Sequence, residues 1–326
     1  MSSVQSPTIG RPGFAKMLLA SPILGPVAAL LLATVFFSVM SPRFLTGTTF
    51  SLILQQVMVV GVLAIGQTLV IITTGIDLSC GMLMAFSGVL MASFAAQKDM
   101  NPFLAILLGI AVAALFGLLN GGLVTGVGLP AFIVTLGTMN IAYALTRIYT
   151  TSTITGLPDQ LTFFGQTFNV AGTDIATGTV LMIVLYVITW FVMKYTAPGR
   201  SVYAVGDNIE AARLAGINTR RVLLGVYTMA GVAYGIAALL QVARTGVGDP
   251  QAGQTSNLDS ITAVVLGGTS LFGGRGSIMG TLVGVLIVGV FRTGLQLMGV
   301  DSTYQVLITG ALVIAAVSVD QLTHRK

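Results

Sequence analysis

The chain has 326 residues, of which 55% are hydrophobic and only 8% are charged, and its mean hydropathy is +0.94. A soluble globular protein has about 25% charged residues. So few charges cannot build a water-facing surface, so the composition excludes a soluble enzyme or binding module. At about 20 residues per transmembrane helix, the length allows about ten spans and leaves no room for a separate extramembrane domain.

The composition also excludes several kinds of chemistry. Cys80 is the single cysteine, so the chain cannot form an intramolecular disulfide. His324 is the single histidine and lies close to the C-terminus, which removes Ser/His/Asp catalysis and histidine-based zinc sites. We therefore expect no catalytic residue, no metal site and no enzyme activity. The formal net charge of +5 has to be divided between the two sides of a membrane before it indicates a partner.

Residues 1–16 are polar, include Arg11 and Lys16, and precede the first apolar run. This run is about as long as a span and lacks a small-residue cleavage site, so we interpret it as an uncleaved first helix. The predicted fold is an all-α polytopic membrane protein with one transmembrane domain over residues 1–326. Its ten predicted transmembrane helices are residues 23–40, 52–74, 78–96, 103–124, 131–149, 175–193, 222–242, 258–272, 278–298 and 304–319.

Some of these helices are expected to be broken. The 40 glycines cluster inside apolar segments, where small residues let helices approach each other closely. Near Gly75 and Gly273 the segments are short or interrupted. An irregular backbone at membrane depth is tolerated only where it lines a cavity or is buried in protein, and the sequence leaves both interpretations open.

The basic residues predict the orientation, because cytoplasmic loops carry the excess of Lys and Arg. With the N-terminus inside and ten spans, more basic residues fall on the inner side than on the outer side. Both termini are therefore predicted to be cytoplasmic. The inner set is Arg11, Lys16, Lys194, Arg200, Arg213, Arg220, Arg221, Arg275, Arg325 and Lys326, and the outer set is Arg43, Lys98, Arg147 and Arg244.

Two connections are longer than the rest. The predicted outer loop, residues 150–174, contains Asp159 and Asp174 and no basic residue, and could be a lid, a docking edge or an ordered connector. The predicted inner loop, residues 195–221, is the only cytoplasmic segment large enough to bind a partner.

The inner loop contains a short predicted helix with its own start and stop signals. Asp207 or Asn208 can cap its N-terminus, Glu210 falls in the first turn, and Gly216 can end it in a left-handed conformation. Ala211 and Leu214 would share one face. Such a two-turn helix is only marginally stable in isolation. It would either fit a groove in another protein or pack against the chain's own helices.

The sequence provides no energy source for active transport. None of Lys16, Lys98, Lys194 and Lys326 follows a glycine, so the Gly-Lys-Ser/Thr signature of a phosphate-binding loop is absent. Ion-coupled carriers place charged residues near the bilayer midplane. Here Arg147, Asp259 and Arg292 fall near predicted helix ends, where long side chains can reach the membrane interface.

Asp77 is the one acidic residue that could lie deeper. It stands between two apolar segments, with Gly75 and Gly81 marking bends. Either Asp77 or Ser79 could cap the third helix, or the Asp77 carboxylate could lie at the inner end of a permeation path.

Neutral polar side chains do occur inside the spans. Amides and hydroxyls without fixed charge suit a neutral, hydrogen-bonding solute such as a sugar, although each one could instead hold two helices together. The residues concerned are Gln55, Gln56, Gln67, Thr68, Asn120, Asn140 and Gln296.

Three ordered motifs carry a family likeness. They are Gly75-Ile-Asp-Leu-Ser-Cys-Gly81, Gly199-Arg-Ser-Val-Tyr-Ala-Val-Gly-Asp-Asn-Ile-Glu-Ala-Ala-Arg-Leu-Ala-Gly-Ile217 and Ala263-Val-Val-Leu-Gly-Gly-Thr-Ser-Leu-Phe-Gly-Gly-Arg-Gly276. Together they resemble the ribose-type monosaccharide permeases of bacterial ABC importers. The likeness extends from about residue 40 to residue 320. Cys80 and the pair Asp207-Asn are minor departures from the usual pattern.

The resemblance implies a multi-pass permease of the bacterial inner membrane that carries no cofactor of its own. It implies as partners a second, identical permease subunit, two cytoplasmic ATPase subunits or one fused ATPase that bind ATP and Mg²⁺, and a periplasmic sugar-binding protein; no nucleic acid is expected. Coupling to the ATPase is assigned to Asp207, Glu210, Ala211, Arg213, Gly216, Arg220 and Arg221. The translocation path is assigned to Gln67, Asp77, Ser79, Asn120 and Asn140, and the outer loop, residues 150–174, would be periplasmic.

Two alternatives stay open from the sequence. Related ABC permeases carry nucleosides or branched-chain amino acids, and no residue excludes these cargoes. A stand-alone carrier or channel for a neutral solute is the other alternative. The helix at 207–216 argues against it, because a facilitator has no evident need of such an element.

Overall fold

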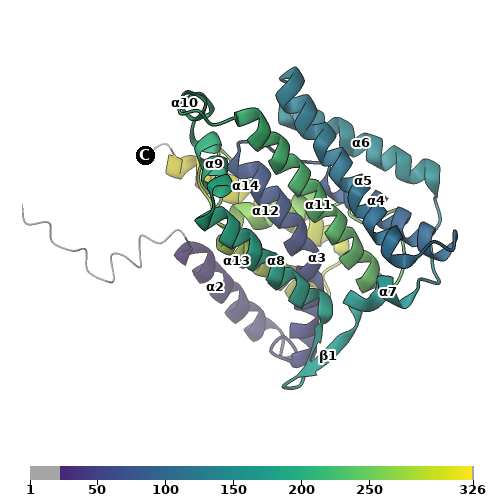
Figure 1. The fold of residues 1–326 in the computed structure, drawn as a ribbon. Helices are drawn as coiled ribbons and strands as arrows, with labels where there is room; N and C mark the ends of the chain where they lie inside the picture. The colour runs from purple at the N-terminus through teal and green to yellow at the C-terminus, as the bar shows by residue number, and fades with distance from the viewer. Residues whose placement is uncertain (1–22, 325–326) are drawn as a thin grey trace, which may run out of the picture.

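A computed structural model describes residues 23–324 of the chain (Figure 1). Each of the ten apolar segments predicted from the sequence overlaps a helix. These helices are α2 (Leu24–Met40), α3 (Gly47–Ile72), α4 (Cys80–Ala96), α5 (Pro102–Gly122, continued by a π-helical turn at Leu123–Val127), α6 (Ala131–Tyr149), α8 (Thr177–Tyr195), α11 (Thr219–Thr245), α12 (Ser256–Leu266), α13 (Ile278–Leu297) and α14 (Ser302–His324).

Six of these helices, α3, α5, α6, α8, α11 and α13, are long and apolar enough to cross a membrane by themselves. Helices α2 and α4 and the apolar part of α14 are shorter, and α12 has only 11 residues. The chain is therefore a polytopic, largely helical membrane protein, while ten spans and two cytoplasmic termini remain predictions. Four of the basic residues behind the predicted orientation, Arg11, Lys16, Arg325 and Lys326, lie outside the described residues.

Helices α3 and α11 run side by side through the centre of the bundle (Figure 1). Leu63 on α3 and Leu240 on α11 are completely buried. Helix α5 packs against α11 so closely that a Cβ on Gly117 would collide with the carbonyl oxygen of Tyr227, and one on Gly231 with that of Ala113. The close helix approach expected from the glycines is therefore present at this contact.

Two turns interrupt the bundle, one after each central helix. After α3, the turn at residues 73–79 is closed by Asp77, whose Oδ1 accepts from the Ser79 backbone N–H at 2.8 Å. After α11, Asp249 Oδ1 accepts from the Gln251 backbone N–H at the same distance. Both are Asx turns, in which the side chain replaces a backbone hydrogen-bond partner.

The two turns are followed by Gly81 and Gly253, whose backbones touch. A Cβ on either glycine would collide with the carbonyl oxygen of the other. Helix α4 begins at Cys80, and Ser79 occupies the cap position without a capping bond from its side chain. The carboxylate of Asp77 instead accepts bonds from Ser79, so Asp77 organises the start of α4 from inside the turn.

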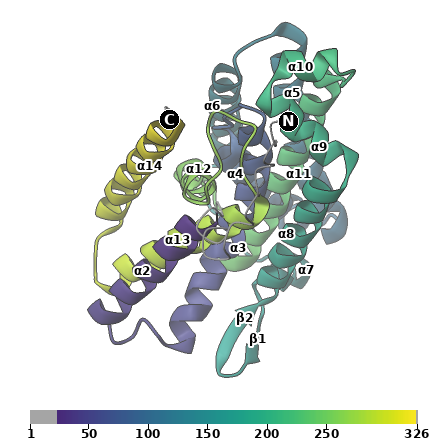
Figure 2. The ribbon, with the colours of Figure 1, turned by 90° about the vertical axis from the view of Figure 1, so that its left-hand side faces the viewer.

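The break expected near Gly273 is also present. The predicted helix 258–272 stops at Leu266, and an irregular segment, residues 267–277, leads to α13. Gly268, Gly273 and Gly274 adopt left-handed backbone conformations there, with φ of 83°, 82° and 67°. Residues that carry a side chain rarely adopt these backbone angles, so the glycines allow the chain to turn back within the bundle. Figure 2 shows the shortened α12 between α14 and α4.

The two long connections lie at opposite ends of the bundle (Figure 1). Residues 150–174 include α7 (Asp159–Thr162) and a 3₁₀ turn (Phe163–Gly165), and β1 (Thr167–Val170) pairs with β2 (Thr173–Ala176) as an antiparallel hairpin. The sequence did not predict this hairpin. The segment 195–221 carries α9 (Ala197–Asp207) and α10 (Ile209–Leu214). We call these ends the hairpin end and the α10 end.

Candidate functional site

The segment 195–221 folds as two short helices. Thr196 Oγ1 accepts from the Gly199 backbone N–H, and Pro198 lies in the first turn of α9. Helix α9 was not predicted from the sequence, although Thr196 followed two residues later by Pro198 is a recognisable helix start. The second helix, α10, was predicted, and its cap is Asn208, whose Oδ1 accepts from the Ala211 N–H at 2.9 Å. Asp207 ends α9 instead.

Helix α10 presents an apolar side chain to solvent. Leu214 is 89% exposed, and Ala211 is exposed as well, whereas Ala212 is buried. Gly216 ends the element with a φ of 85°, as predicted. No described part of the chain covers Leu214, so packing of this face against the chain's own helices, the alternative considered from the sequence, is absent here.

The predicted charged residues surround this apolar tip. Glu210 and Arg213 form an exposed pair at 3.9 Å, a separation at which a surface ion pair contributes less than about 1 kcal/mol. Arg220 and Arg221 are exposed in the first turn of α11, which Asn218 caps by accepting from the Arg221 N–H at 3.0 Å. These charges are therefore available to a partner.

Helix α9 packs against the end of α3 and against residues 267–277, which are themselves joined by a hydrogen bond. The Gly274 N–H donates to the carbonyl oxygen of Ile72, the last residue of α3, at 2.9 Å. A Cβ on Gly206 would collide with the same oxygen. The Tyr203 hydroxyl donates to the Gly276 carbonyl oxygen at 3.0 Å, and burial raises the pKa of Tyr203, which keeps the donor protonated. Helix α9 therefore lies directly against the end of α3 and against the segment before α13.

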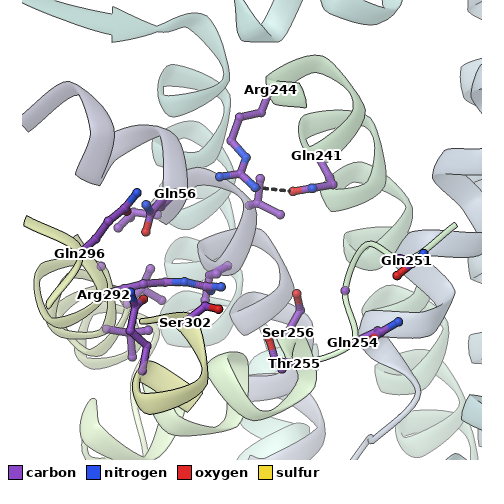
Figure 3. Close-up of a pocket in the computed structure, with 18 residues that line it drawn as sticks. Gln56, Gln241, Arg244, Gln251, Gln254, Thr255, Ser256, Arg292, Gln296 and Ser302 are labelled. Atoms are coloured by element: carbon purple, nitrogen blue, oxygen red, sulfur yellow. Dashed lines mark hydrogen bonds between the residues drawn. The ribbon is translucent and has the colours of Figure 1, made fainter. Parts of the chain in front are cut away.

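A cavity of about 560 Å³ opens among α3, α11, α12, α13 and α14 (Figure 3). This volume is in the range typical of small-molecule sites. Most of its polar lining consists of amide and hydroxyl groups, and the remainder is two arginine guanidinium groups. The polar lining residues are Gln56, Gln241, Arg244, Gln251, Gln254, Thr255, Ser256, Arg292, Gln296, Ser302 and Gln305.

Two contacts fix the cationic side chains of this cavity. Arg244 Nη2 donates to Gln241 Oε1 at 3.0 Å (Figure 3). Arg292 Nη1 lies 2.8 Å from Asp259 Oδ2, with the Asp259 side chain 7% exposed and that of Arg292 45% exposed. The sequence indicated only that Asp259 and Arg292 fall near predicted helix ends, within reach of the membrane interface, and did not predict that they pair. They pair across α12 and α13 and leave part of the guanidinium facing the cavity.

Gln56 is the lining amide with an unused acceptor. Its Oε1 is buried and has no hydrogen-bond partner within the described chain. A buried acceptor without a partner costs about 1–3 kcal/mol, and a hydroxyl donor entering the cavity could satisfy it.

The residues assigned to the path from the sequence lie elsewhere. Asn120 Nδ2 donates to Ser79 Oγ at 3.2 Å, and Ser79 Oγ bonds to Asp77, so these residues form one buried network. Gln67 accepts from Tyr234 at 3.4 Å. All four are fully shielded from solvent, and Asn140 lies apart on an exposed face of α6. Their role in the path stays a prediction.

Most of the residues that line the cavity were not predicted from the sequence. Gln296 and Gln56 were noted as polar groups in spans, but Gln241, Arg244, Gln251 and Gln254 were not selected. The available signal was the spacing of Gln241 and Arg244 on the last turn of an otherwise apolar helix, followed by a polar connection. Only the fold brings that connection to Gln56 and Arg292.

The structure combines a polar cavity inside a bundle of apolar helices with an exposed short helix, α10, at one end. Residues 49–317 match the family described as branched-chain amino acid transport system / permease component, and the chain belongs to this family. A permease component of this kind is a transport subunit and not an enzyme.

Curated relatives cover nearly the whole chain. The chain is 45% identical to a fructose import permease protein of Rhizobium meliloti, over 93% of this chain and 86% of the relative. It is 40% identical to a ribose import permease protein of Bacillus subtilis (91% and 92%) and 38% identical to that of Escherichia coli K12 (90% and 91%). No solved structure matches the chain.

Proposed function

We propose that this chain is the membrane-spanning subunit of an ABC importer that translocates a monosaccharide across a bacterial inner membrane. The observation that carries the cargo is the set of relatives, which are named as fructose and ribose import permeases and match the chain over about nine-tenths of its length. Although the family description mentions branched-chain amino acids, these relatives favour a sugar. A periplasmic binding protein would deliver it.

The cavity supports this cargo chemically. Gln56, Gln251 and Gln296 provide amides that both donate and accept, as the hydroxyls of a sugar ring require. Arg244 and Arg292 add donors at fixed positions. A sugar can exchange its bonds with water for these contacts without carrying charge.

The chain would work as one of two identical subunits bound to separate ATPase subunits. Leu214 and Ala211 of α10 would occupy a groove of an ATPase, with Glu210, Arg213, Arg220 and Arg221 at its rim. ATP-driven closure of the ATPases would move α10, and the contacts of Gly206 and Tyr203 would pass this movement to α3 and to residues 267–277. The cavity would then alternate between the two sides, with ATP supplying the bias.

Coupling predicts that uptake depends on the ATPase. Cells that contain this chain and the binding protein should accumulate labelled sugar only when the ATPase subunits are present. Glu210→Arg should abolish co-purification of the ATPase and uptake together, since it reverses the charge beside Leu214. Ser201→Arg, on the neighbouring α9, is the control for an added surface charge. Uptake at full rate without the ATPase would instead indicate a stand-alone carrier.

The cavity predicts a defect in substrate recognition. Gln56→Leu should raise the sugar concentration for half-maximal uptake by about tenfold, because one hydrogen-bonding amide is lost at similar side-chain volume. Gln55→Leu is the matched control, since Gln55 precedes it on α3 but bonds to Ser51 and does not line the cavity. Uptake would be measured with the complete transporter in vesicles. Equal effects of the two substitutions would contradict a substrate path through this cavity.

A further inference from the structure

A second cavity, of about 400 Å³, lies at the α10 end where α8, α9 and the start of α13 meet. It shares no residue with the polar cavity described above. Its lining consists of Trp190, Met193, Lys194, Arg200, Tyr203, Ser277 and Ile278. This lining contains two basic side chains and no acidic one, so its electrostatic potential favours an anion.

One of the two basic groups, the Lys194 ammonium, is held by aromatic rings. The Lys194 ammonium lies 5.1 Å from the centre of the Trp190 ring and 5.3 Å from that of Tyr195. Cation–π contacts of this kind leave the ammonium able to donate to a further acceptor. Arg200 is exposed on the first turns of α9, and it reaches the same cavity.

The part of α8 that precedes the residues lining this cavity presents exposed apolar side chains. Val187, Ile188 and Phe191 of α8 are each at least half exposed, and α8 is one of the six helices of membrane-spanning length. Tryptophan, tyrosine and lysine at the end of such a helix mark the level of the lipid headgroups. An apolar track for acyl chains thus leads directly to a basic, aromatic cavity.

We infer that this cavity binds the phosphate of an anionic phospholipid, with Lys194 and Arg200 as its donors and the exposed face of α8 beneath the acyl chains. Basic pockets between transmembrane helices bind anionic headgroups in this manner. The bound lipid would lie against Tyr203 and Ser277. These residues adjoin the contacts that attach α9 to the bundle, so the lipid would brace α9 from the membrane side.

The test is binding of phosphatidylglycerol to the purified full-length chain in neutral detergent, followed by native mass spectrometry. The wild-type chain should bind it about tenfold more tightly than phosphatidylcholine, and Lys194→Gln with Arg200→Gln should remove that preference. Lys194→Arg should keep it, because it retains the charge. Arg43→Gln with Lys98→Gln removes two exposed charges elsewhere on the chain and should leave the preference intact.

Several outcomes would overturn the inference. Equal binding of the two lipids by the wild-type chain would exclude recognition of the anion. If the Arg43/Lys98 control lost the preference for phosphatidylglycerol to the same extent, the net charge of the chain would explain that preference. Displacement of phosphatidylglycerol by inorganic phosphate would assign the cavity to a free anion. Should the double variant aggregate, unchanged binding by Lys194→Gln alone would be decisive against the site. None of these results depends on sugar uptake.

Discussion

Gly206→Ala should stop sugar uptake while leaving the ATPase bound. The added methyl group has no space, because a Cβ at this position would collide with the carbonyl oxygen of Ile72. Overpacking of this kind costs about 1–3 kcal/mol and would push α9 away from the end of α3. Helix α10 is capped separately by Asn208, so its docking face should survive. ATP hydrolysis would then continue without driving transport.

The measurement compares co-purified ATPase, ATP hydrolysis and uptake in the same vesicles. Gly225→Ala is the matched control, because Gly225 is a helical glycine of α11 with open space where a Cβ would be. At that position alanine should be neutral or slightly stabilising. Normal uptake by Gly206→Ala would show that α9 does not transmit the movement of α10.

Arg292→Leu should destabilise the protein by about 3 kcal/mol. The substitution leaves the buried Asp259 carboxylate without its half-exposed partner, and a buried charge without a partner costs more than the pair contributes. Asp259→Asn combined with Arg292→Gln should recover most of the loss, since no charge then remains buried. Arg213→Leu breaks only the exposed pair with Glu210 and should cost less than about 1 kcal/mol.

Thermal unfolding of the purified chain in detergent would rank these variants. If Arg292→Leu and the double variant unfolded at the same temperature, the loss would come from packing of the long side chain and not from the unpaired carboxylate. The double variant should still transport poorly, because the cavity would lose a fixed guanidinium.

The sequence predicted what depends on local pattern. Apolar runs predicted every long helix, and the caps around Asn208 and Gly216 predicted α10 almost to the residue. It failed where an interaction joins distant segments. Asp259 and Arg292 are 33 residues apart, and nothing in either neighbourhood indicates their pairing. The hairpin was missed because its strands are only four residues long and only the first of them, Thr167–Val170, alternates polar and apolar residues.

The candidate site divides in the same way. Helix α10 could be predicted because its composition differs from that of its surroundings. The cavity could not, because its residues come from five helices and a connection, each of which is unremarkable alone. Asp77 and Asn120 are polar residues inside apolar segments, and the sequence could not predict that they share one buried network.

The reciprocal contact of Gly81 and Gly253 restricts what evolution and protein engineering can do to both halves of the bundle. Each position excludes a side chain because of the other residue's backbone, which no substitution can shrink. A change at one position therefore has no compensating change at the other. Two residues in direct contact would thus leave no trace of covariation, and methods that infer contacts from correlated substitutions would not find the place where the two turns meet.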